Sequence, residues 1–155
     1  MIYIAHRGNI GPSTEKLSTI RKIEHALSLG YEVEIDVRYS NKTIWVGHDK
    51  AEEEIPTKFL TDNSSKLWCH CKNSKALTLC LRMNLICFWH QTDDYTLTSN
   101  GYIWAYPGCT AKGGILVMPE LMTITDFSKY LGICSDKIEY YKEIIEREPE
   151  KNEED

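Results

Sequence analysis

The chain has 155 residues, a length that suits one domain with a single core. Its composition, 42% hydrophobic and 26% charged, is that of a water-soluble globular protein, and no apolar stretch approaches the roughly 18 residues that a membrane helix requires. The net charge of −5 resides in the acidic segment 143–155, so the rest of the chain carries no basic stripe of the kind that nucleic-acid binding requires.

The sequence divides into one predicted domain, residues 1–146, and an acidic tail, residues 147–155, that is expected to be disordered and solvated. An acidic docking segment is the alternative interpretation of the tail. The N-terminus lacks the basic and then apolar design of a signal peptide, so we expect a cytoplasmic protein.

Six cysteines in a chain of this kind are expected to be reduced thiols that pack as small apolar groups. The string Cys69-His70-Cys71 could suggest a zinc site. In a strand, however, alternate residues point to opposite faces, which would place the two thiols on one side and the imidazole on the other. Buried thiols are therefore the favoured interpretation.

The first fifty residues predict a strand, a helix and a hairpin. Residues 2–5 form an apolar strand, and apolar side chains recur at helical spacing over 17–27 until Gly30 ends the helix. Residues 31–37 form a second strand, in which Glu34 and Asp36 share one face roughly 6 to 7 Å apart along the strand. Asn41-Lys42 then turns the chain into a strand over 43–46.

The rest of the chain continues the alternation of strands and helices. Further strands are predicted over 67–71, 85–89, 102–106, 115–118 and 132–134. Further helices are predicted over 74–83, 94–98, 124–131 and 137–145. This order favours an α/β protein with a mostly parallel sheet.

Polar residues close nearly every predicted strand: His6, Asp36, Lys72, His90, Tyr106, Glu120 and Asp136. Chemistry delivered by the ends of many strands is typical of a (β/α)₈ barrel, whereas an open sheet gathers its ligand contacts at one switch point. Because such barrels usually have about 250 residues, we predict a trimmed TIM-type barrel with shortened or missing helices.

Three motifs follow one another within 44 residues: Ala5-His6-Arg7-Gly8, Glu34-Ile35-Asp36-Val37 and Val46-Gly47-His48-Asp49. In content, order and spacing they resemble the glycerophosphodiester phosphodiesterase family. Lys72, which follows the strand at 67–71, and Gly132-Ile133-Cys134-Ser135-Asp136 extend the resemblance more weakly toward the C-terminus. The resemblance implies a barrel that hydrolyses a small or head-group phosphodiester with the help of a divalent cation.

The residue types suit that chemistry. His6 and His48 can divide the general base and general acid roles, because an imidazole changes its protonation state near neutral pH. Arg7 and Lys72 offer positive charge to a phosphate, and Glu34 and Asp36 are oxygen ligands for Mg²⁺ or Ca²⁺. A structural ion pair between these acids and the basic residues is the alternative.

Two further residues are candidates for substrate contact. His90 ends a strand that runs into a polar segment, and Trp104 lies on one strand face with Tyr102 and Tyr106. These aromatic side chains suit a sugar or glycerol group, and core filling is the alternative role.

Two departures from the family pattern concern the metal. The family has a glutamate early in its first helix, and Leu17 stands at that position, with Glu15 two residues earlier as a substitute. A second family glutamate corresponds to His70, a nitrogen ligand better suited to Mn²⁺, Zn²⁺ or another transition metal. His70 as a phosphate-facing cation without a metal role remains an alternative.

The sequence therefore predicts a phosphodiesterase assisted by Mg²⁺, Ca²⁺ or Mn²⁺. A lyase that stops at a cyclic phosphate and a catalytically lapsed binding module stay open as alternatives.

Overall fold

The computed structural model describes residues 1–147, and ten strands in that part of the chain form one mixed sheet. The strands are β1 (Ile2–His6), β2 (Glu32–Ser40), β3 (Thr43–Val46), β4 (Glu53–Glu54), β5 (Leu67–Cys71), β6 (Ile86–Phe88), β7 (Tyr95–Leu97), β8 (Ile103–Ala105), β9 (Ile115–Val117) and β10 (Gly132–Ser135). Their order is β4-β3-β2-β1-β10-β9-β8-β7, and β5 and β6 branch from β2. The predicted α/β class and the largely parallel pairing are confirmed.

Strand β2 is long enough to pair with different neighbours along its length. Its first part lies parallel to β1 and β5, and its last four residues pair with β3 as the predicted antiparallel hairpin. The register sets Glu34 beside His6 on one neighbour and Asp36 beside His70 on the other. The two acids of the second motif therefore lie between the two histidine-bearing strands.

The sheet curls strongly into a half-barrel and does not close. At one end the sheet forks at β2, so that β4 and β6 are both edge strands, and the other end is β7, which runs antiparallel to β8. The concave face is filled by seven buried side chains: Ile4, Trp68, Phe88, Trp104, Ile115, Val117 and Cys134. The predicted trimmed TIM-type barrel is thus found only in part, because strands as short as these, with an antiparallel pair at one end, do not complete the circle of parallel pairings that a closed barrel requires.

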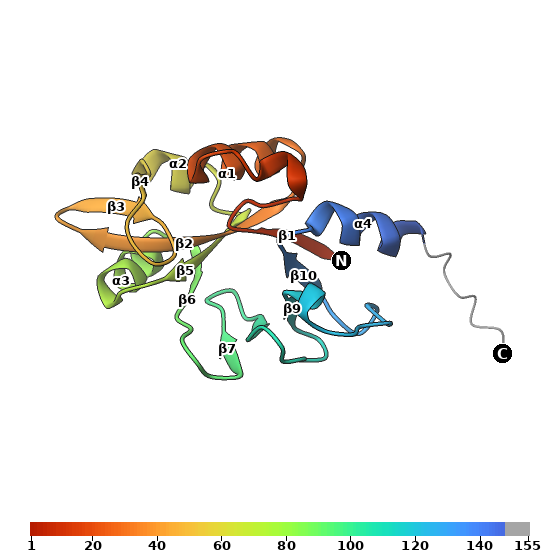
Figure 1. The fold of residues 1–155 in the computed structure, drawn as a ribbon. Coiled ribbons are helices and arrows are strands. Elements are labelled where there is room, and N and C mark those ends of the chain that lie inside the picture. Colours follow the sequence, from red (N-terminus) through yellow and green to blue (C-terminus); the bar gives the residue numbers. More distant parts are fainter. Residues whose placement is uncertain (148–155) are drawn as a thin grey trace.

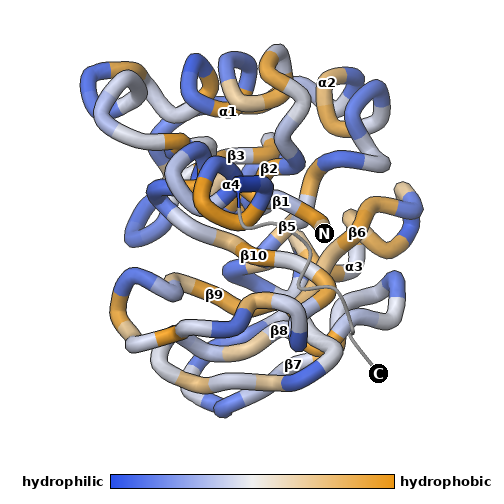
Figure 2. The backbone as a smooth tube through the Cα atoms, turned by 90° about the vertical axis from the view of Figure 1, so that its right-hand side faces the viewer, coloured by the Kyte–Doolittle hydropathy of each residue, from blue (hydrophilic) through white to orange (hydrophobic). Residues whose placement is uncertain are grey.

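Helices cover the other face of the sheet. They are α1 (Thr19–Ser28), α2 (Thr57–Asp62), α3 (Ser74–Arg82) and α4 (Ile138–Arg147), and each contributes to the larger apolar cluster. Figures 1 and 2 show that β7, β8 and β9 lie apart from these helices, so the later part of the sheet lacks the helical layer of a full barrel. The predicted shortening of the helical layer is found there.

Most predicted elements lie within a few residues of the observed ones, and two do not. The helix expected over 94–98 is instead β7, and the stretch expected as a helix over 124–131 contains none. Pairing with β8 overrides the weak helical preference of the residues that form β7. The short helix α2 had no counterpart in the prediction.

The C-terminal helix α4 continues through Arg147, the first residue assigned to the acidic tail. The rest of that predicted tail, residues 148–155, lies outside the described residues. Among the helices that are described, none has the length and apolar character that crossing a bilayer requires.

Candidate functional site

A cavity of about 550 Å³ opens where the parallel strands end. Four of the five histidines of the chain line it, namely His6, His48, His70 and His90. The fifth, His25, lies on α1 away from the cavity. The cavity lining also includes Arg7, Glu34, Arg38, Asp49, Lys72, Trp89, Gln91, Trp104, Tyr106 and Pro107. The strand-end residues that the sequence predicted as a site are therefore largely brought together.

The turn after β1 is shaped by Arg7 and Gly8, which both have left-handed backbone angles, with φ of 52° and 76°. A Cβ on Gly8 would lie 2.7 Å from the backbone nitrogen of Ile23 on α1, so only glycine fits there. The turn directs the backbone N–H of Arg7 to a Glu34 carboxylate oxygen, 3.2 Å away. Such strain in a non-glycine residue is frequent at functional sites.

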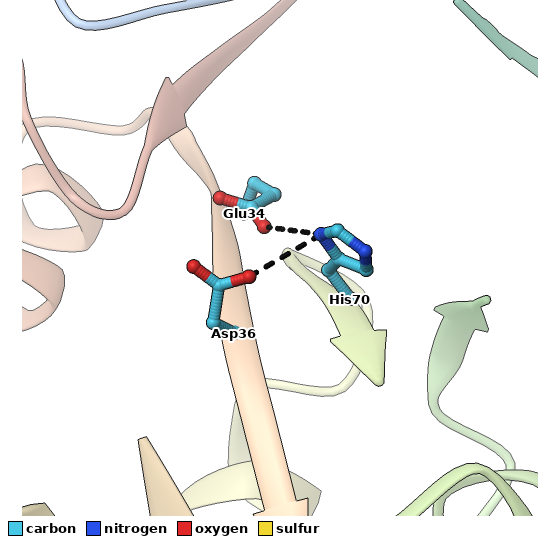
Figure 3. Close-up of side chains that lie close together, drawn as sticks. All are labelled: Glu34, Asp36 and His70. Carbon is cyan, nitrogen blue, oxygen red and sulfur yellow. Dashed lines mark ion pairs between the residues drawn. The ribbon is translucent and has the colours of Figure 1, made fainter. Parts of the chain in front are cut away.

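The centre of the cluster consists of Glu34, Asp36 and His70, shown in Figure 3. Nδ1 of His70 lies 3.3 Å from Oδ1 of Asp36 and 3.7 Å from Oε1 of Glu34. One ligand atom from each side chain lies within 4.8 Å of the other two, and both carboxylates are buried. The predicted sharing of one strand face by the two acids is confirmed, and this group can hold a metal ion.

The hydrogen bonding around the group fits a cation. Nε2 of His70 lies 2.8 Å from the backbone carbonyl of His90, which can only accept a hydrogen bond, so Nε2 carries a proton. In the neutral ring Nδ1 therefore presents a lone pair to the two carboxylates. Oδ1 of Asp36 is buried and accepts no well-aligned hydrogen bond within residues 1–147, although Lys72 Nζ lies 3.2 Å from it as an ion-pair partner. Three lone pairs facing one point, with a backbone carbonyl holding the histidine, form the usual surroundings of a divalent metal.

Asp36 also lies among positive groups. Arg7 Nε and Lys72 Nζ lie 3.1 Å and 3.2 Å from its carboxylate oxygens. Burial acts to raise the pKa of Asp36, but the adjacent His70 and the charge of Lys72 outweigh it and hold that pKa well below its ordinary value. Burial, and then the charge of Asp36, raise the pKa of Glu34. Asp36 is thus ionised at neutral pH, whereas burial makes the ionised form of Glu34 less favourable in free energy.

Each of the two motif histidines, His6 and His48, is held by a carboxylate. His6 Nδ1 lies 2.8 Å from Oδ1 of Asp136 at the end of β10, and His48 Nδ1 lies 3.0 Å from Oδ2 of Asp36. A carboxylate accepts at Nδ1 in both cases, which leaves Nε2 of each ring for other partners. Burial acts to lower the pKa of His6, but the hydrogen bond to Asp136 and the charge of Glu34 outweigh it and raise that pKa.

Asp136, which the sequence placed at a polar strand end and in the C-terminal segment of the resemblance, is thus a direct partner of His6. Asn9 donates to the same carboxylate oxygen at 2.8 Å. Glu120 accepts hydrogen bonds from the hydroxyl of Ser135 and from the backbone N–H of Asp136, at 2.9 Å and 3.1 Å. Glu120 therefore fixes the end of β10 rather than facing the cavity.

Arg38 was missed by the sequence analysis. It lines the cavity, and it donates a hydrogen bond from Nη2 to the carbonyl of His48 at 2.6 Å. The alternation that placed Glu34 and Asp36 on one face of a strand extends to Arg38, two residues further on. The sequence therefore did carry a signal for it.

The remaining predicted residues occupy different places. Trp104 lines the cavity but is only 4% exposed and packs 4.6 Å from Phe88 between ring centroids, so it mainly fills the concave core. Leu17 is on the surface, and Glu15 lines a separate cavity near Tyr140. Neither supplies the missing family ligand.

The thiols of Cys69 and Cys71 lie in the apolar cluster under the helices, whereas His70 faces the cavity. The predicted division of this string between two faces of the strand is confirmed. All six cysteines are free thiols.

Comparison of this chain with known protein families, curated proteins and solved structures finds no match. The resemblance stated above therefore rests on the motif residues themselves.

Proposed function

We propose that this protein hydrolyses a phosphodiester, with His6 and His48 as the acid and base. The observation that carries the proposal is that each of these imidazoles is bound through Nδ1 to its own carboxylate beside one cavity that also contains Arg7 and Lys72. A carboxylate at Nδ1 fixes the tautomer and orientation of an imidazole, so Nε2 is the atom that exchanges protons with a substrate.

The charges of the cluster suit an anionic substrate together with a divalent cation. Three carboxylates stand against two permanent cations: Glu34, Asp36 and Asp136 against Arg7 and Lys72. A divalent ion reverses that excess of negative charge, which favours the binding of a phosphodiester monoanion.

Glu34, Asp36 and His70 would hold the ion. Mn²⁺ or Zn²⁺ fits this set of two oxygens and one nitrogen better than Ca²⁺ or Mg²⁺ does. When bound, such an ion neutralises charge that develops on the phosphoryl oxygens and lowers the pKa of an attacking hydroxyl.

The reaction proceeds in two balanced steps. A hydroxyl next to the ester oxygen attacks phosphorus and gives its proton to one histidine, while the other histidine protonates the departing alkoxide as its bond to phosphorus breaks. A cyclic phosphate and an alcohol result. Water then opens the cyclic phosphate with the two histidines in exchanged roles. Arg7 and Lys72 bind the non-bridging oxygens throughout.

Turnover of methyl glycerol phosphate, followed by phosphorus NMR in the presence of Mn²⁺, tests the proposal, because this diester has the neighbouring hydroxyl that attacks and a leaving alkoxide that needs a proton. We expect His6→Ala and His48→Ala each to lower kcat by about 10²- to 10⁴-fold. The matched control is His25→Ala, which removes the one histidine outside the cavity and leaves kcat unchanged. Equal activity in the wild type and both site variants would exclude the proposed roles.

Product analysis decides between hydrolysis and the lyase alternative. Phosphorus NMR of a glycerophosphodiester digest shows a monoester as the final product if water opens the ring, and a persistent cyclic phosphate if it does not. A substrate analogue without the neighbouring hydroxyl that is cleaved equally fast would exclude the intramolecular attack.

A further inference from the structure

One wall of the cavity is aromatic and is not used by the proposed chemistry. Trp89 follows β6 and Tyr106 follows β8, and both line the cavity while remaining 37% and 38% exposed. Pro107 continues this wall. The charged residues that would hold the phosphate, Arg7 and Lys72, follow β1 and β5. The volume of about 550 Å³ is in the range of sites that hold molecules much larger than a phosphate.

A nearly buried histidine stands beside this wall. His90 is 7% exposed, and its ring lies edge-on to that of Tyr106 with centroids 5.5 Å apart. Its Nε2 bonds to the backbone carbonyl of Asp93, which can only accept, so Nε2 carries the proton. In the neutral ring Nδ1 is then an acceptor.

No residue among 1–147 donates a hydrogen bond to Nδ1 of His90, and this atom is not among the buried unpartnered atoms of the structure. Since His90 lines the cavity and Nδ1 keeps some exposure to solvent, a ligand in the cavity can reach this atom. The aromatic wall therefore contains one acceptor that needs a donor from the ligand.

This combination selects among ligand types. An alkyl chain or an unsubstituted ring would cover the aromatic wall but would exclude water from Nδ1 of His90 without offering it a donor, which costs free energy. A sugar-sized polyol presents C–H groups to the faces of Trp89 and Tyr106 and a hydroxyl donor to His90.

We propose that the alcohol part of the substrate is a sugar-sized cyclic polyol that lies against Trp89 and Tyr106 and donates one hydroxyl to Nδ1 of His90. This inference rests on the proposed phosphodiesterase function and names the substrate class of the same site.

Three methyl phosphodiesters test it, with turnover followed by phosphorus NMR. Their alcohols are ethylene glycol, cis-1,2-cyclohexanediol and galactose joined through O3. All three carry a hydroxyl next to the ester, so they share the chemical step and differ only in the ring and its further hydroxyls. We expect kcat/KM to be at least tenfold higher for the galactose ester than for either of the others.

The outcomes separate the two proposals. If no ester is turned over, the proposed function fails and this inference with it. If the esters are turned over but the cyclohexanediol ester matches or exceeds the galactose ester, the inference alone is overturned.

Variants of His90 test the role of Nδ1. His90→Gln keeps an N–H near the position of Nε2 and lacks an acceptor at the position of Nδ1, whereas His90→Asn keeps an acceptor near Nδ1. We expect the Gln variant to lower the galactose-to-cyclohexanediol ratio of kcat/KM at least fivefold and the Asn variant to retain most of it. An unchanged ratio in the Gln variant, with a Tm close to that of the wild type, would overturn the proposed contact.

Trp89→Ala tests the aromatic wall. It is expected to raise KM for the galactose ester more than for the ethylene glycol ester. Tyr95→Ala is the matched control, because Tyr95 is an exposed aromatic residue on β7 outside this cavity. Equal changes of KM for both esters in Trp89→Ala would contradict stacking.

Discussion

His70 donates a hydrogen bond from Nε2 to the backbone carbonyl of His90 across 2.8 Å, and this contact determines which nitrogen faces the carboxylates. Nδ1 is left 3.3 Å from Asp36 and 3.7 Å from Glu34. Either a proton or a metal ion must separate these acceptors, because three lone pairs would otherwise repel one another. His70 is therefore the residue whose replacement reveals most about the site.

We predict that the wild type binds Mn²⁺ or Zn²⁺ more tightly than Mg²⁺ or Ca²⁺, and that His70→Glu reverses much of that preference. The substitution replaces a nitrogen ligand with a hard oxygen ligand, which favours the alkaline-earth ions. Isothermal titration with each metal measures the effect, with His25→Glu as the control that adds the same charge on α1. Identical metal preferences in the wild type and His70→Glu would show that His70 is no ligand.

Glu34→Gln is predicted to stabilise the metal-free protein at neutral pH. The pKa of Glu34 is raised by burial and by Asp36, so the folded state disfavours its ionised form. The penalty is absent below the ordinary glutamate pKa of about 4.3 and grows as the pH rises through the higher folded pKa. The gain in unfolding free energy is therefore expected above that range and appears as a higher Tm of the variant.

Thermal unfolding in EDTA between pH 4 and pH 8 measures this gain, and excess Mn²⁺ should reverse the order by stabilising only the wild type. Glu54→Gln, which neutralises an exposed acid on β4, should show neither effect. A less stable metal-free Glu34→Gln would mean that its contacts with Arg7 and the histidines outweigh the cost of its burial.

One thiol is predicted to react quickly in the native state. Cys109 is half-buried, whereas the other five cysteines are buried. Access of the reagent decides this ranking, because burial raises the pKa of both the Cys109 and the Cys134 thiol. Titration with Ellman's reagent should give one fast equivalent before unfolding and six after it. Cys109→Ser should remove the fast equivalent, and a fast phase that persists in this variant would contradict the assignment.

The periodicity of apolar residues and the polar residues at strand ends predicted most of the fold, because both are properties of short stretches of sequence. The alternation in β2 placed Glu34 and Asp36 on one face, and the order of strands and helices indicated parallel pairing. The sequence predicted a trimmed barrel but not that the sheet stays open, because closure depends on whether β6 pairs with β7 or β8, and no short stretch of sequence determines that pairing. The segment at β7 was misassigned for a similar reason, since its conformation comes from pairing with β8.

In the candidate site, too, local motifs were predicted, and contacts between distant segments were not. His6, His48 and the two acids of β2 were found by their motifs, whereas the partnership of His6 with Asp136 spans 130 positions and depends on β10 pairing with β1. No local sequence pattern predicts a contact between residues this far apart. The carbonyl of His90 as the partner of His70 is equally invisible, because any residue supplies a backbone carbonyl.

Asp136→Asn is predicted to destabilise the metal-free protein within a defined pH window. The pKa of Asp136 is affected first by burial, which acts to raise it, but its hydrogen bond with His6 and the charge of that ring lower it overall. Its stabilising contribution is therefore present above the ordinary aspartate pKa of about 3.9 and is lost as the pH falls through the lower folded value.

The raised pKa of His6 sets the upper limit of the window. Burial opposes the shift, but the Asp136 contact prevails, so the contribution is complete below the ordinary histidine pKa of about 6.5 and is lost as the pH rises through the folded value. The difference in unfolding free energy between wild type and Asp136→Asn should thus be largest from about pH 4 to pH 6.5. Because the Asp136 side chain is 38% exposed, water screens the pair and the maximum should be about 1 kcal/mol.

Urea unfolding in EDTA across pH 3 to pH 9 measures the window. The control is Asp126→Asn, whose carboxylate pairs with Lys129 and has a pKa lowered to about 2 by Ser128 and Lys129. Its effect should stay constant between pH 5 and pH 8, because no group of that pair titrates there. If the effect of Asp136→Asn were equally flat over that range, His6 would not be charged in partnership with Asp136. The hydrogen bond would then orient a neutral imidazole only.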